Sequence, residues 1–464
     1  MNLYKPQYHF IPEKNWMNDP NGPIYYKGKY HLFYQHNPND YHWNTIHWGH
    51  AVSEDLVHWE HLPIALSPSN ELGEKHCFSG CAVINNDGLP TLFYTSIGEN
   101  ERNAKDGAQQ WMAVSHDDMV SWEKYNSNPV LELSIHGDTD IKEWRDPFVW
   151  KENEVWYMVL GGGCEEKGCV LIYSSPDLMN WKFLNKMFET PEFKFLECPN
   201  MLKFGNKYVL IYSPSDIVRY HVGTLNQDYT FTSEYEGILD NSGWEGFYAP
   251  NTLIDPIGRK IMWGWMTEVS RGEFEGGSGW AGAQSIPRVL TLDSHNSLKM
   301  EPAPEYDMLR YDEESYSNEV INKNKMTFEN KGRALEIEVE IKISGDEDFS
   351  LNVLESPDNQ EKTTIRYDAL AGEIFVDRSK SSISDQVHKT ILKSQLKKET
   401  GQLLNIRVFV DHSIIEVFAD SEICLSTRVY PTLESSENVS LELNKGNELN
   451  IQELSIWKME SIWQ

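Results

Sequence analysis

Three carboxylates occupy, or lie next to, the same position in a repeated sequence pattern. Asp19 lies in N-D-P-N, Asp146 in R-D-P-F and Glu197 in E-C-P-N. Each segment is followed by a short apolar run, a turn and a second run that is rich in Tyr, Phe and Trp. Carboxylates that meet in an aromatic pocket, in a chain without a metal-binding motif, indicate glycoside chemistry, which needs a nucleophile or base and an acid that protonates the leaving oxygen.

Two further segments, F-S-G-C from residue 78 and Y-A-P-N from residue 248, repeat the same frame. Successive copies are 60, 67, 52 and 51 residues apart, counted between their second residues. A four-stranded propeller blade needs about 40 to 60 residues with its loops. We therefore expect one blade per segment. Stacked blades bring equivalent positions together around one axis, so that the three carboxylates meet in one pocket.

The position of Glu197 in its segment differs from that of the two aspartates. Asp19 and Asp146 are second in their segments, whereas Glu197 is first. Adjacent side chains of a regular strand point to opposite faces. Two explanations remain open: the segments begin irregularly, as the prolines at positions 20, 147 and 199 favour, or the fourth copy is offset by one residue.

The neighbours of each carboxylate predict its protonation state. Asn18 and nearby amides are expected to hold Asp19 ionised. Glu197 lies between a leucine and a cysteine, a less polar setting that favours the protonated form of an acid. Arg145 is expected to keep Asp146 charged. A charged carboxylate that does not react can bind sugar hydroxyls and offset positive charge at the anomeric centre.

The composition restricts the class of protein. A chain of 464 residues predicts two domains. A formal net charge of −30 argues against nucleic acid or an anionic membrane as a partner. The first residues lack the layout of a signal peptide, and no apolar run approaches the roughly 20 residues of a membrane span. The six dispersed cysteines are expected to be free thiols of a cytoplasmic protein, although a disulfide between Cys164 and Cys169 stays open.

The strand pattern changes near residue 300. We expect an all-β fold with a propeller over residues 1–305, a linker over 306–329 that contains the acidic stretch 312–319, and an antiparallel β-sandwich over 330–464. The sandwich is predicted from strict alternation of apolar residues, as at 335–343, and from a hairpin around residues 411–413.

Four histidines lie close together in the sequence, at positions 36, 42, 47 and 50. They form no H-E-x-x-H motif, so hydrogen bonding or packing is favoured over metal binding. The chain also has no G-x-S-x-G and no phosphate-binding G-x-x-x-x-G-K-[S/T] motif. No cofactor and no metal are expected.

Several motifs together resemble a known family. W-M-N-D-P-N-G at 16–22, W-R-D-P at 144–147 and E-C-P-N at 197–200 resemble the three catalytic blocks of the β-fructofuranosidases, glycoside hydrolase family 32. H-W-G-H at 47–50, F-S-G at 78–80 and G-W-A-G-A-Q-S-I-P-R at 279–288 resemble further blocks, and D-H-S-I-I-E-V-F at 411–418 looks like the signature of the C-terminal sandwich. One departure is the cysteine at 81, where the family commonly has a small residue.

The resemblance implies a five-bladed β-propeller with a β-sandwich, and hydrolysis with retention of configuration. By analogy, Asp19 is the nucleophile, Glu197 the acid/base and Asp146 the transition-state stabiliser. The residues expected to bind substrate are Trp16, Asn18, Gln35, Trp43, Phe78, Ser79, Arg145, Tyr248 and Trp265.

The favoured substrate is a terminal non-reducing β-D-fructofuranosyl residue of sucrose or a short fructan. Hydrolysis of sucrose 6-phosphate is the alternative, with Lys75, Lys105 and Arg271 as loop candidates for phosphate binding. Fructosyl transfer stays open because it shares the covalent intermediate. A non-catalytic fructan-binding protein is the alternative from another class, and the intact carboxylate set argues against it. The sequence does not determine the preferred linkage or the oligomeric state.

Overall fold

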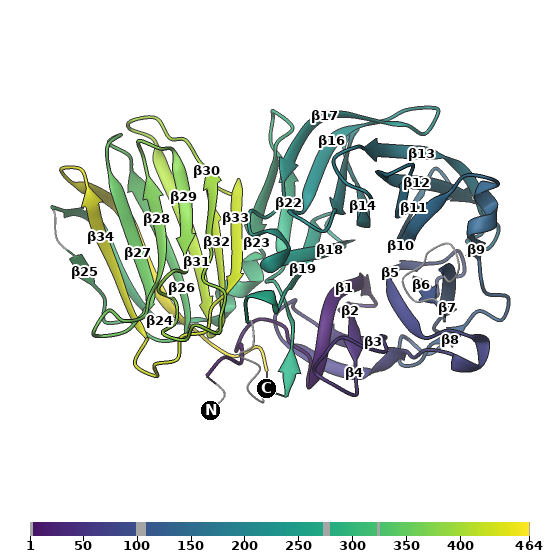
Figure 1. Cartoon of the computed structure of the whole chain (residues 1–464), viewed down its shortest axis with the longest axis horizontal. Coiled ribbons are helices and arrows are strands. Elements are labelled where there is room, and N and C mark those ends of the chain that lie inside the picture. Colours follow the sequence, from purple (N-terminus) through teal and green to yellow (C-terminus); the bar gives the residue numbers. More distant parts are fainter. Residues whose placement is uncertain (1–2, 99–107, 272–278, 323–324, 464) are drawn as a thin grey trace.

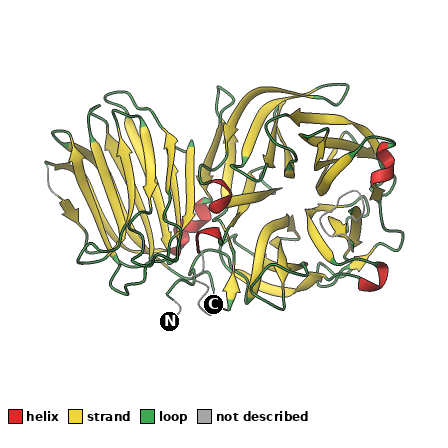
Figure 2. Cartoon of the chain, in the orientation of Figure 1, coloured by secondary structure: helices red, strands yellow, loops and turns green. Residues whose placement is uncertain are grey.

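The computed structural model describes residues 3–98, 108–271, 279–322 and 325–463. Within these residues, strands dominate and the helices are five short 3₁₀ turns (Figure 2). These turns are η1 (Asn70–Leu72), η2 (Leu133–His136), η3 (Gly243–Glu245), η4 (Val269–Arg271) and η5 (Pro304–Leu309). No helix in the described part of the chain has the length and apolar character of a membrane span.

Five sheets, which are antiparallel except for one short strand, form the first part of the structure (Figure 1). Blade 1 contains β1 (Asn15–Tyr26), β2 (Lys29–Asn37), β3 (His47–Ser53) and β4 (Trp59–Leu66). Blade 2 contains β5 (His76–Ile84), β6 (Pro90–Ile97), β7 (Gln109–Val114), β8 (Glu123–Lys124) and β9 (Leu131–Glu132). Blade 3 contains β10 (Ile141–Glu152), β11 (Val155–Cys164), β12 (Lys167–Ser175) and β13 (Lys182–Thr190).

The remaining two blades close the ring. Blade 4 contains β14 (Glu197–Phe204), β15 (Lys207–Ser213), β16 (Arg219–Leu225) and β17 (Phe231–Ile238). Blade 5 contains β18 (Phe247–Ile254), β19 (Lys260–Met266), β21 (Ala283–Gln284), β22 (Arg288–Leu292) and β23 (Leu298–Pro302). The first strands of the blades contact one another in a circle, β1 with β5 and β18, β10 with β5 and β14, and β14 with β18. The fold is therefore a five-bladed β-propeller, and the short β20 (Trp280–Ala281) adds to blade 1 in parallel with β1.

All five inner strands carry the same irregularity. Against its second strand, each has an extra residue, between Met17 and Pro20, Cys77 and Gly80, Arg145 and Phe148, Glu197 and Asn200, and Tyr248 and Asn251; β1 and β10 each have a second one nearby. Such a bulge places two residues opposite one and breaks the alternation of side chains. The segments therefore begin irregularly. The bulge of the fourth copy starts at the same place in the repeated frame as those of the third and fifth copies, whereas the bulges of the first two copies start one residue earlier. Cys198 corresponds to Asp146, both with positive φ (48° and 66°), and Glu197 lies at the edge of the bulge.

The second part of the structure is a sandwich of two six-stranded sheets. In sheet order, the first contains β24 (Arg310–Ile321), β35 (Leu449–Met459), β26 (Ala334–Lys342), β31 (Leu403–Asp411), β32 (Ile414–Ala419) and β33 (Ile423–Arg428). The second contains β25 (Lys325–Thr327), β34 (Asn438–Lys445), β27 (Asp348–Glu355), β28 (Thr363–Asp368), β29 (Glu373–Asp377) and β30 (Ile391–Gln395).

The prediction of a linker over residues 306–329 is wrong. These residues contain β24 and β25, each of which is the edge strand of one sandwich sheet. Most of β24 is exposed, so its acidic residues give no alternating apolar pattern. Charged residues on an edge strand also oppose pairing with another chain. The acidic stretch is therefore a strand that resembles a linker in composition.

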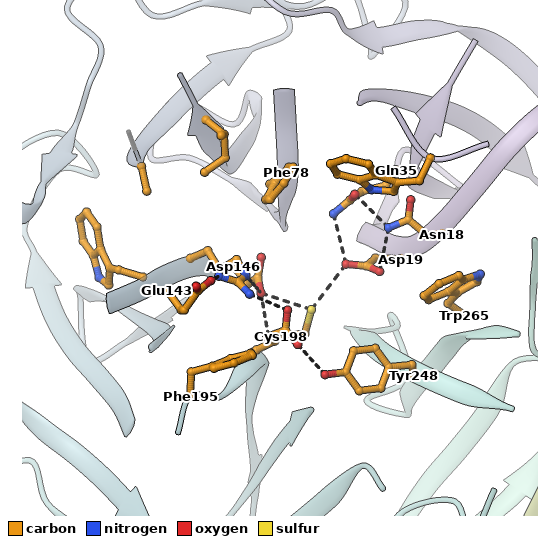
Figure 3. A pocket seen from close by; sticks show the side chains of 16 residues that line it. Asn18, Asp19, Gln35, Phe78, Glu143, Asp146, Phe195, Cys198, Tyr248 and Trp265 are labelled. Atoms are coloured by element: carbon orange, nitrogen blue, oxygen red, sulfur yellow. Dashed lines mark hydrogen bonds and ion pairs between the residues drawn. The ribbon is translucent and has the colours of Figure 1, made fainter. Parts of the chain in front are cut away.

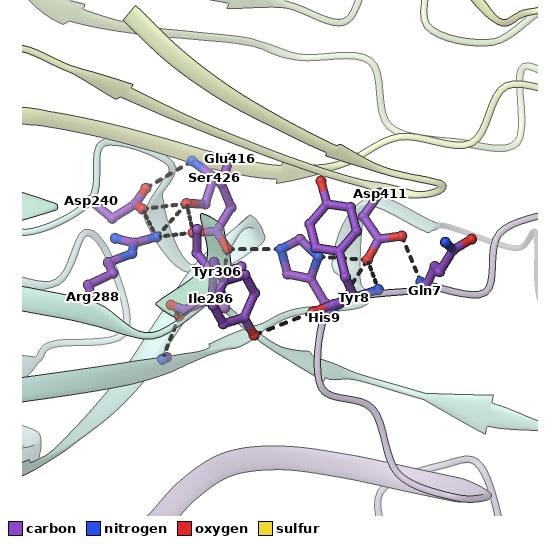
Figure 4. A network of polar contacts seen from close by, with 12 residues as sticks. Gln7, Tyr8, His9, Asp240, Ile286, Arg288, Tyr306, Asp411, Glu416 and Ser426 are labelled. Atoms are coloured by element: carbon purple, nitrogen blue, oxygen red, sulfur yellow. Dashed lines mark hydrogen bonds and ion pairs between the residues drawn. The ribbon is translucent and has the colours of Figure 1, made fainter. Parts of the chain in front are cut away.

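Buried polar contacts join the two parts of the chain (Figure 4). The backbone N–H groups of Gln7, Tyr8 and His9 donate to the Asp411 carboxylate at 2.7 to 2.8 Å. The His9 ring lies between Asp411 (2.9 Å) and Glu416 (3.0 Å). Glu416 also accepts from Arg288 of blade 5 at 2.6 Å. An apolar cluster continues across the same interface, so the sandwich is packed firmly against blade 5.

Candidate active site

A pocket of about 400 Å³ opens where the inner strands meet (Figure 3). It is lined by Asn18, Asp19, Gln35, Trp43, Phe78, Ile97, Ala108, Glu143, Trp144, Arg145, Asp146, Phe195, Glu197, Cys198, Tyr248 and Trp265. Ten of the twelve predicted site residues are in this set. The other two lie directly behind it: Ser79 donates a hydrogen bond to Asp19, and the Trp16 indole donates to Asn18 at 2.7 Å.

Asp19 projects from the bulge of β1 and is held by three polar side chains. Asn18 donates to its Oδ1 at 3.0 Å, Gln35 donates to its Oδ2 at 3.2 Å, and Ser79 donates to the same oxygen. Burial raises the pKa of Asp19 to about 6, the hydrogen bonds from Ser79 and Asn18 oppose the increase, and the charge of Glu197 adds to it. The amides therefore orient Asp19, but they hold it ionised less strongly than the sequence suggested.

Asp146 is the most buried of the three carboxylates, with 5% of the residue exposed. Its Oδ2 accepts the backbone N–H of Cys198 at 2.9 Å, and its own N–H donates to Thr95 Oγ1 at 2.9 Å. Burial raises the pKa of Asp146 to about 7 against the opposing effect of Arg145. The prediction that Arg145 keeps this carboxylate charged is therefore not confirmed. The Arg145 Nε lies 4.0 Å from Asp146 because the rest of the guanidinium group binds elsewhere.

Glu197 has polar neighbours on both of its oxygens. Arg145 Nη2 donates to Oε1 at 2.8 Å, and the Tyr248 hydroxyl donates to Oε2 at 2.5 Å. Ser215 Oγ lies 3.3 Å from Oε2. The less polar setting inferred from its sequence neighbours is therefore incorrect, since residues of β10 and β18 surround the carboxylate. These contacts orient Glu197 toward the same space as Asp19.

Cys198 lies between the two aspartates. Its Sγ is 3.5 Å from Asp146 Oδ2 and 3.7 Å from Asp19 Oδ2. Burial and the neighbouring carboxylates raise the pKa of this thiol well above its ordinary value. A thiol that stays protonated is a poor nucleophile. Cys198 therefore acts as a weak donor to the carboxylates that surround it.

Aromatic rings form much of the remaining wall. Trp43 stacks on His76 with ring centroids 5.3 Å apart and an 18° angle between the planes. Trp16 meets Trp265 edge to face at 5.8 Å. Such rings, fixed from behind, present flat apolar faces to a sugar, while Asn18, Gln35 and Arg145 present donors and acceptors.

Sequence reasoning missed some of the lining residues, of which Glu143 and Phe195 carry the most information. Glu143 binds Arg145 Nη1, while Arg145 Nη2 binds Glu197, so one guanidinium group bridges two glutamates. Phe195 packs against the same guanidinium group, 5.5 Å from ring centroid to Cζ. The sequence contained one signal for Glu143: it lies two residues before Arg145, and residues at this spacing are on the same face of a regular strand.

The histidines and the proposed phosphate ligands lie elsewhere. The His36, His47 and His50 rings each have a separate partner, the carbonyls of Trp16 and Thr45 and the ring of His31, respectively. Arg271 is buried 3.6 Å from Glu268, and Lys75 is exposed and does not line the pocket. Lys105 lies outside the described residues. Among the described lining residues, Arg145 is the only lysine or arginine.

Comparison with known proteins gives matches over almost the whole chain. Residues 9–302 match the glycosyl hydrolases family 32 N-terminal domain, and residues 305–458 match the glycosyl hydrolases family 32 C-terminal domain. A sucrose-6-phosphate hydrolase of Escherichia coli is 30% identical over 489 residues, which cover 99% of this chain and 95% of the relative. A levanase of Bacillus subtilis is 32% identical over 494 residues, which cover 99% of this chain and 71% of the relative.

Solved structures give the same result. The crystal structure of fructan 1-exohydrolase IIa from Cichorium intybus has a TM-score of 0.89 at 25% identity, covering 99% of this chain and 98% of that one. A GH32 beta-fructofuranosidase of Bombyx mori has a TM-score of 0.81 at 30% identity, covering 100% of this chain and 96% of the other.

Proposed function

Because the chain belongs to glycosyl hydrolase family 32, we propose that it is a retaining β-fructofuranosidase that releases terminal non-reducing β-D-fructofuranosyl residues from sucrose and short fructans. The observation that carries this proposal is the meeting of Asp19, Asp146 and Glu197, from blades 1, 3 and 4, in one aromatic-walled pocket. Each carboxylate is oriented by its own hydrogen bonds, as a double displacement requires.

In the proposed first step, Asp19 attacks the anomeric carbon of the fructosyl unit. The bond to the leaving oxygen breaks, Glu197 gives that oxygen its proton, and a covalent ester forms on Asp19. In the second step, Glu197 takes a proton from water, which attacks the same carbon and releases Asp19. Two displacements at one carbon retain its configuration.

Asp146 and Arg145 are proposed to act on the fructosyl ring. Their side chains lie beside Glu197 and can bind ring hydroxyls. Negative charge on Asp146 also stabilises the oxocarbenium-like transition state. The charge of Asp19 raises the pKa of Asp146, so the loss of that charge on ester formation favours the ionised Asp146.

The charge of the pocket favours a neutral sugar as substrate. Its described lining residues include four carboxylates, those of Asp19, Glu143, Asp146 and Glu197, and the single guanidinium group of Arg145. Each of the two terminal nitrogens of Arg145 already binds a glutamate. A phosphate dianion at this position would be repelled. Hydrolysis of sucrose 6-phosphate stays the second candidate because the Escherichia coli relative carries that name.

Fructose release from sucrose, sucrose 6-phosphate, inulin and levan at equal concentrations tests the proposal. We expect the highest kcat/KM with sucrose or a fructan, and loss of release in Asp19→Ala and Glu197→Gln. Preference for sucrose 6-phosphate would support the second candidate. Full activity in Asp19→Ala would contradict the assigned mechanism.

We further propose a cytoplasmic location. All six cysteines are buried free thiols, Cys164 and Cys169 included, which is typical of proteins in a reducing compartment. Comparison of activity in intact and permeabilised source cells tests this. Activity recovered mainly from the medium would contradict it.

A further inference from the structure

Glu268, just after β19, contacts both the propeller and the sandwich. Its Oε1 accepts the Gly282 N–H at 2.8 Å and lies 3.1 Å from Arg428 Nη2 in the sandwich. Its Oε2 accepts the Tyr430 hydroxyl at 2.9 Å and lies 3.6 Å from Arg271 Nη1. The Arg428 side chain is fully buried, and only 9% of the Glu268 side chain is exposed. This carboxylate is therefore the main counter-charge of a buried arginine.

Gly282, which binds Glu268, also lies against β1 of blade 1. Its φ is +84°, and a Cβ at this position would lie 2.0 Å from the carbonyl oxygen of Met17. Glycine is therefore required for this close approach. The residue before it, Ala281, pairs with Trp16 in the parallel β1–β20 contact. The Glu268 carboxylate thus fixes a backbone segment that lies directly against β1.

Gln284 completes the connection to the pocket. Its side chain is fully buried, and Nε2 donates to the carbonyl oxygen of Asn18 at 2.7 Å. Its Oε1 has no hydrogen-bond partner among the described residues. Asn18 in turn donates Nδ2 to Asp19 Oδ1. The buried side-chain amide of Gln284 therefore makes its polar contact with the Asn18 carbonyl. Asn18 is the residue directly before Asp19.

We propose that Glu268 is a positioning residue for the nucleophile. By binding Arg428 and Gly282, it fixes residues 280–284 against β1, and Gln284 then sets the position of Asn18 relative to Asp19. The sandwich thereby takes part in orienting the active site in addition to packing against blade 5. This inference rests on the proposed function only in that Asp19 is the nucleophile.

The pH profile separates positioning from packing. The groups that face Asp19 are Asn18, Gln35, Ser79 and Cys198, together with the carboxylates of Glu197 and Asp146. The hydrogen bond from Asn18 lowers the pKa of Asp19, so displacement of Asn18 moves the acidic limb of the kcat/KM profile to higher pH. A contact that only packs the domains together changes the stability and leaves this limb in place.

The test compares Glu268→Gln, Gln284→Met and the double variant. Glu268→Gln removes the charge that faces Arg428, Arg271 and Tyr430, and Gln284→Met removes the donor to Asn18 while keeping the length of the side chain. We expect each single variant to lower kcat about tenfold per folded molecule, with KM changed less, and to move the acidic limb upward. The double variant should lose little more than either single variant, since both act on one chain of contacts.

Asp240→Asn is the matched control. Asp240 is buried at the same interface, 2.9 Å from Arg288 and hydrogen-bonded to Ser426, and among the described residues its carboxylate has no hydrogen bond or ion pair to β1. It should lower the stability and leave kcat and the acidic limb unchanged. The proposal is overturned if Glu268→Gln and Gln284→Met leave kcat and the acidic limb unchanged. It is also overturned if Asp240→Asn moves the acidic limb as far as these two variants do. If Glu268→Gln does not fold, Gln284→Met decides by the same criteria. Absence of fructose release by the wild type would instead contradict the proposed function.

Discussion

The backbone N–H of Cys198 donates to Asp146 Oδ2 at 2.9 Å, which joins the inner strands of blades 3 and 4 at the axis. Cys198 directly follows Glu197 in β14. This bond therefore fixes the position of Asp146 relative to Glu197, although the two carboxylates do not contact each other. Asp19 of blade 1, which like Cys198 is the second residue of its segment, lies 3.7 Å from the thiol of the same Cys198. The bulges of three blades therefore meet around one cysteine.

The pH dependence of kcat/KM should show raised carboxylate pKa values. Burial raises the pKa of Asp19 to about 6 and that of Asp146 to about 7. Since both are needed ionised, kcat/KM should decrease as the pH falls from 7 to 6, well above the ordinary range of an aspartate. The two steps belong to the coupled set of carboxylates and not to single residues.

Asn18→Ala should move this limb to higher pH, because the hydrogen bond from Asn18 lowers the pKa of Asp19. Phe78→Leu is the matched control, since Phe78 lines the same pocket and its side chain donates no hydrogen bond. It should lower kcat/KM without moving the limb. An unchanged limb in Asn18→Ala would contradict the role of this hydrogen bond.

Tyr248→Phe should lower kcat about tenfold or more. It removes the 2.5 Å hydrogen bond to Glu197, and a hydrogen bond to a charged group contributes about 1.5 to 3 kcal/mol. Tyr208→Phe is the control, because Tyr208 donates to Glu152 at 2.6 Å outside the pocket. Steady-state kinetics of both variants measure the difference. Equal kcat values in the two variants would show that the Tyr248 contact has no catalytic effect.

Asp146→Asn should stabilise the protein at pH 8. The pKa of Asp146 is about 7 in the folded protein and 3.8 as its ordinary value, so the folded form binds the proton more tightly. Ionisation therefore reduces stability progressively from about pH 4 to 7, and the full reduction persists above pH 7.

Asparagine keeps an oxygen for the Cys198 N–H and has no charge. The free energy of unfolding of Asp146→Asn should exceed that of the wild type by on the order of 2 kcal/mol at pH 8, with a smaller difference at pH 4. Urea unfolding at both pH values measures this. A difference that is independent of pH would exclude ionisation of Asp146 as its cause.

The interface between propeller and sandwich should weaken at alkaline pH. Burial lowers the pKa of His9, but its hydrogen bonds to the carboxylates of Asp411 and Glu416 outweigh this effect, and the pKa of His9 is raised from the ordinary value of 6.5. The stability from a raised histidine pKa is fully present below 6.5 and is lost as the pH rises through the folded value.

His9→Gln should therefore lose stability below pH 6.5 and show a flatter dependence above it. His221→Gln is the control, because burial lowers the pKa of His221 within blade 4. Thermal unfolding from pH 5.5 to 9 compares the variants. A wild-type stability that stays constant over this range would contradict the prediction.

The repeat and its carboxylates could be predicted from the sequence because residue types recur at blade spacing. The bulge could not, since an extra residue in β14 is defined only by its pairing with β15, for example Glu197 with Ser213. The same limit explains why the polar surroundings of Glu197 were not predicted. The neighbours of Glu197 that matter are Arg145 and Tyr248, each about 50 residues away in the chain.

The contacts between the two domains could not be predicted from the local sequence. His9 meets Asp411 across 402 positions, and both residues look ordinary in their own segments. The strand β24 was missed for a different reason. As an exposed edge strand it needs no apolar face, so its composition is that of a linker.

The pairing of β20 with β1 has a consequence for the time at which a newly made chain becomes functional. Residues 15 and 16 leave the ribosome early, but their partners at 280 and 281 follow only after the first four blades and the first two strands of blade 5. Until then the strand that carries Asp19 lacks its last neighbour. The nascent chain must therefore reach a minimum length before this part of the site can form. A chain that ends before residue 284 lacks the hydrogen bond from Gln284 to Asn18, even if its first four blades are folded.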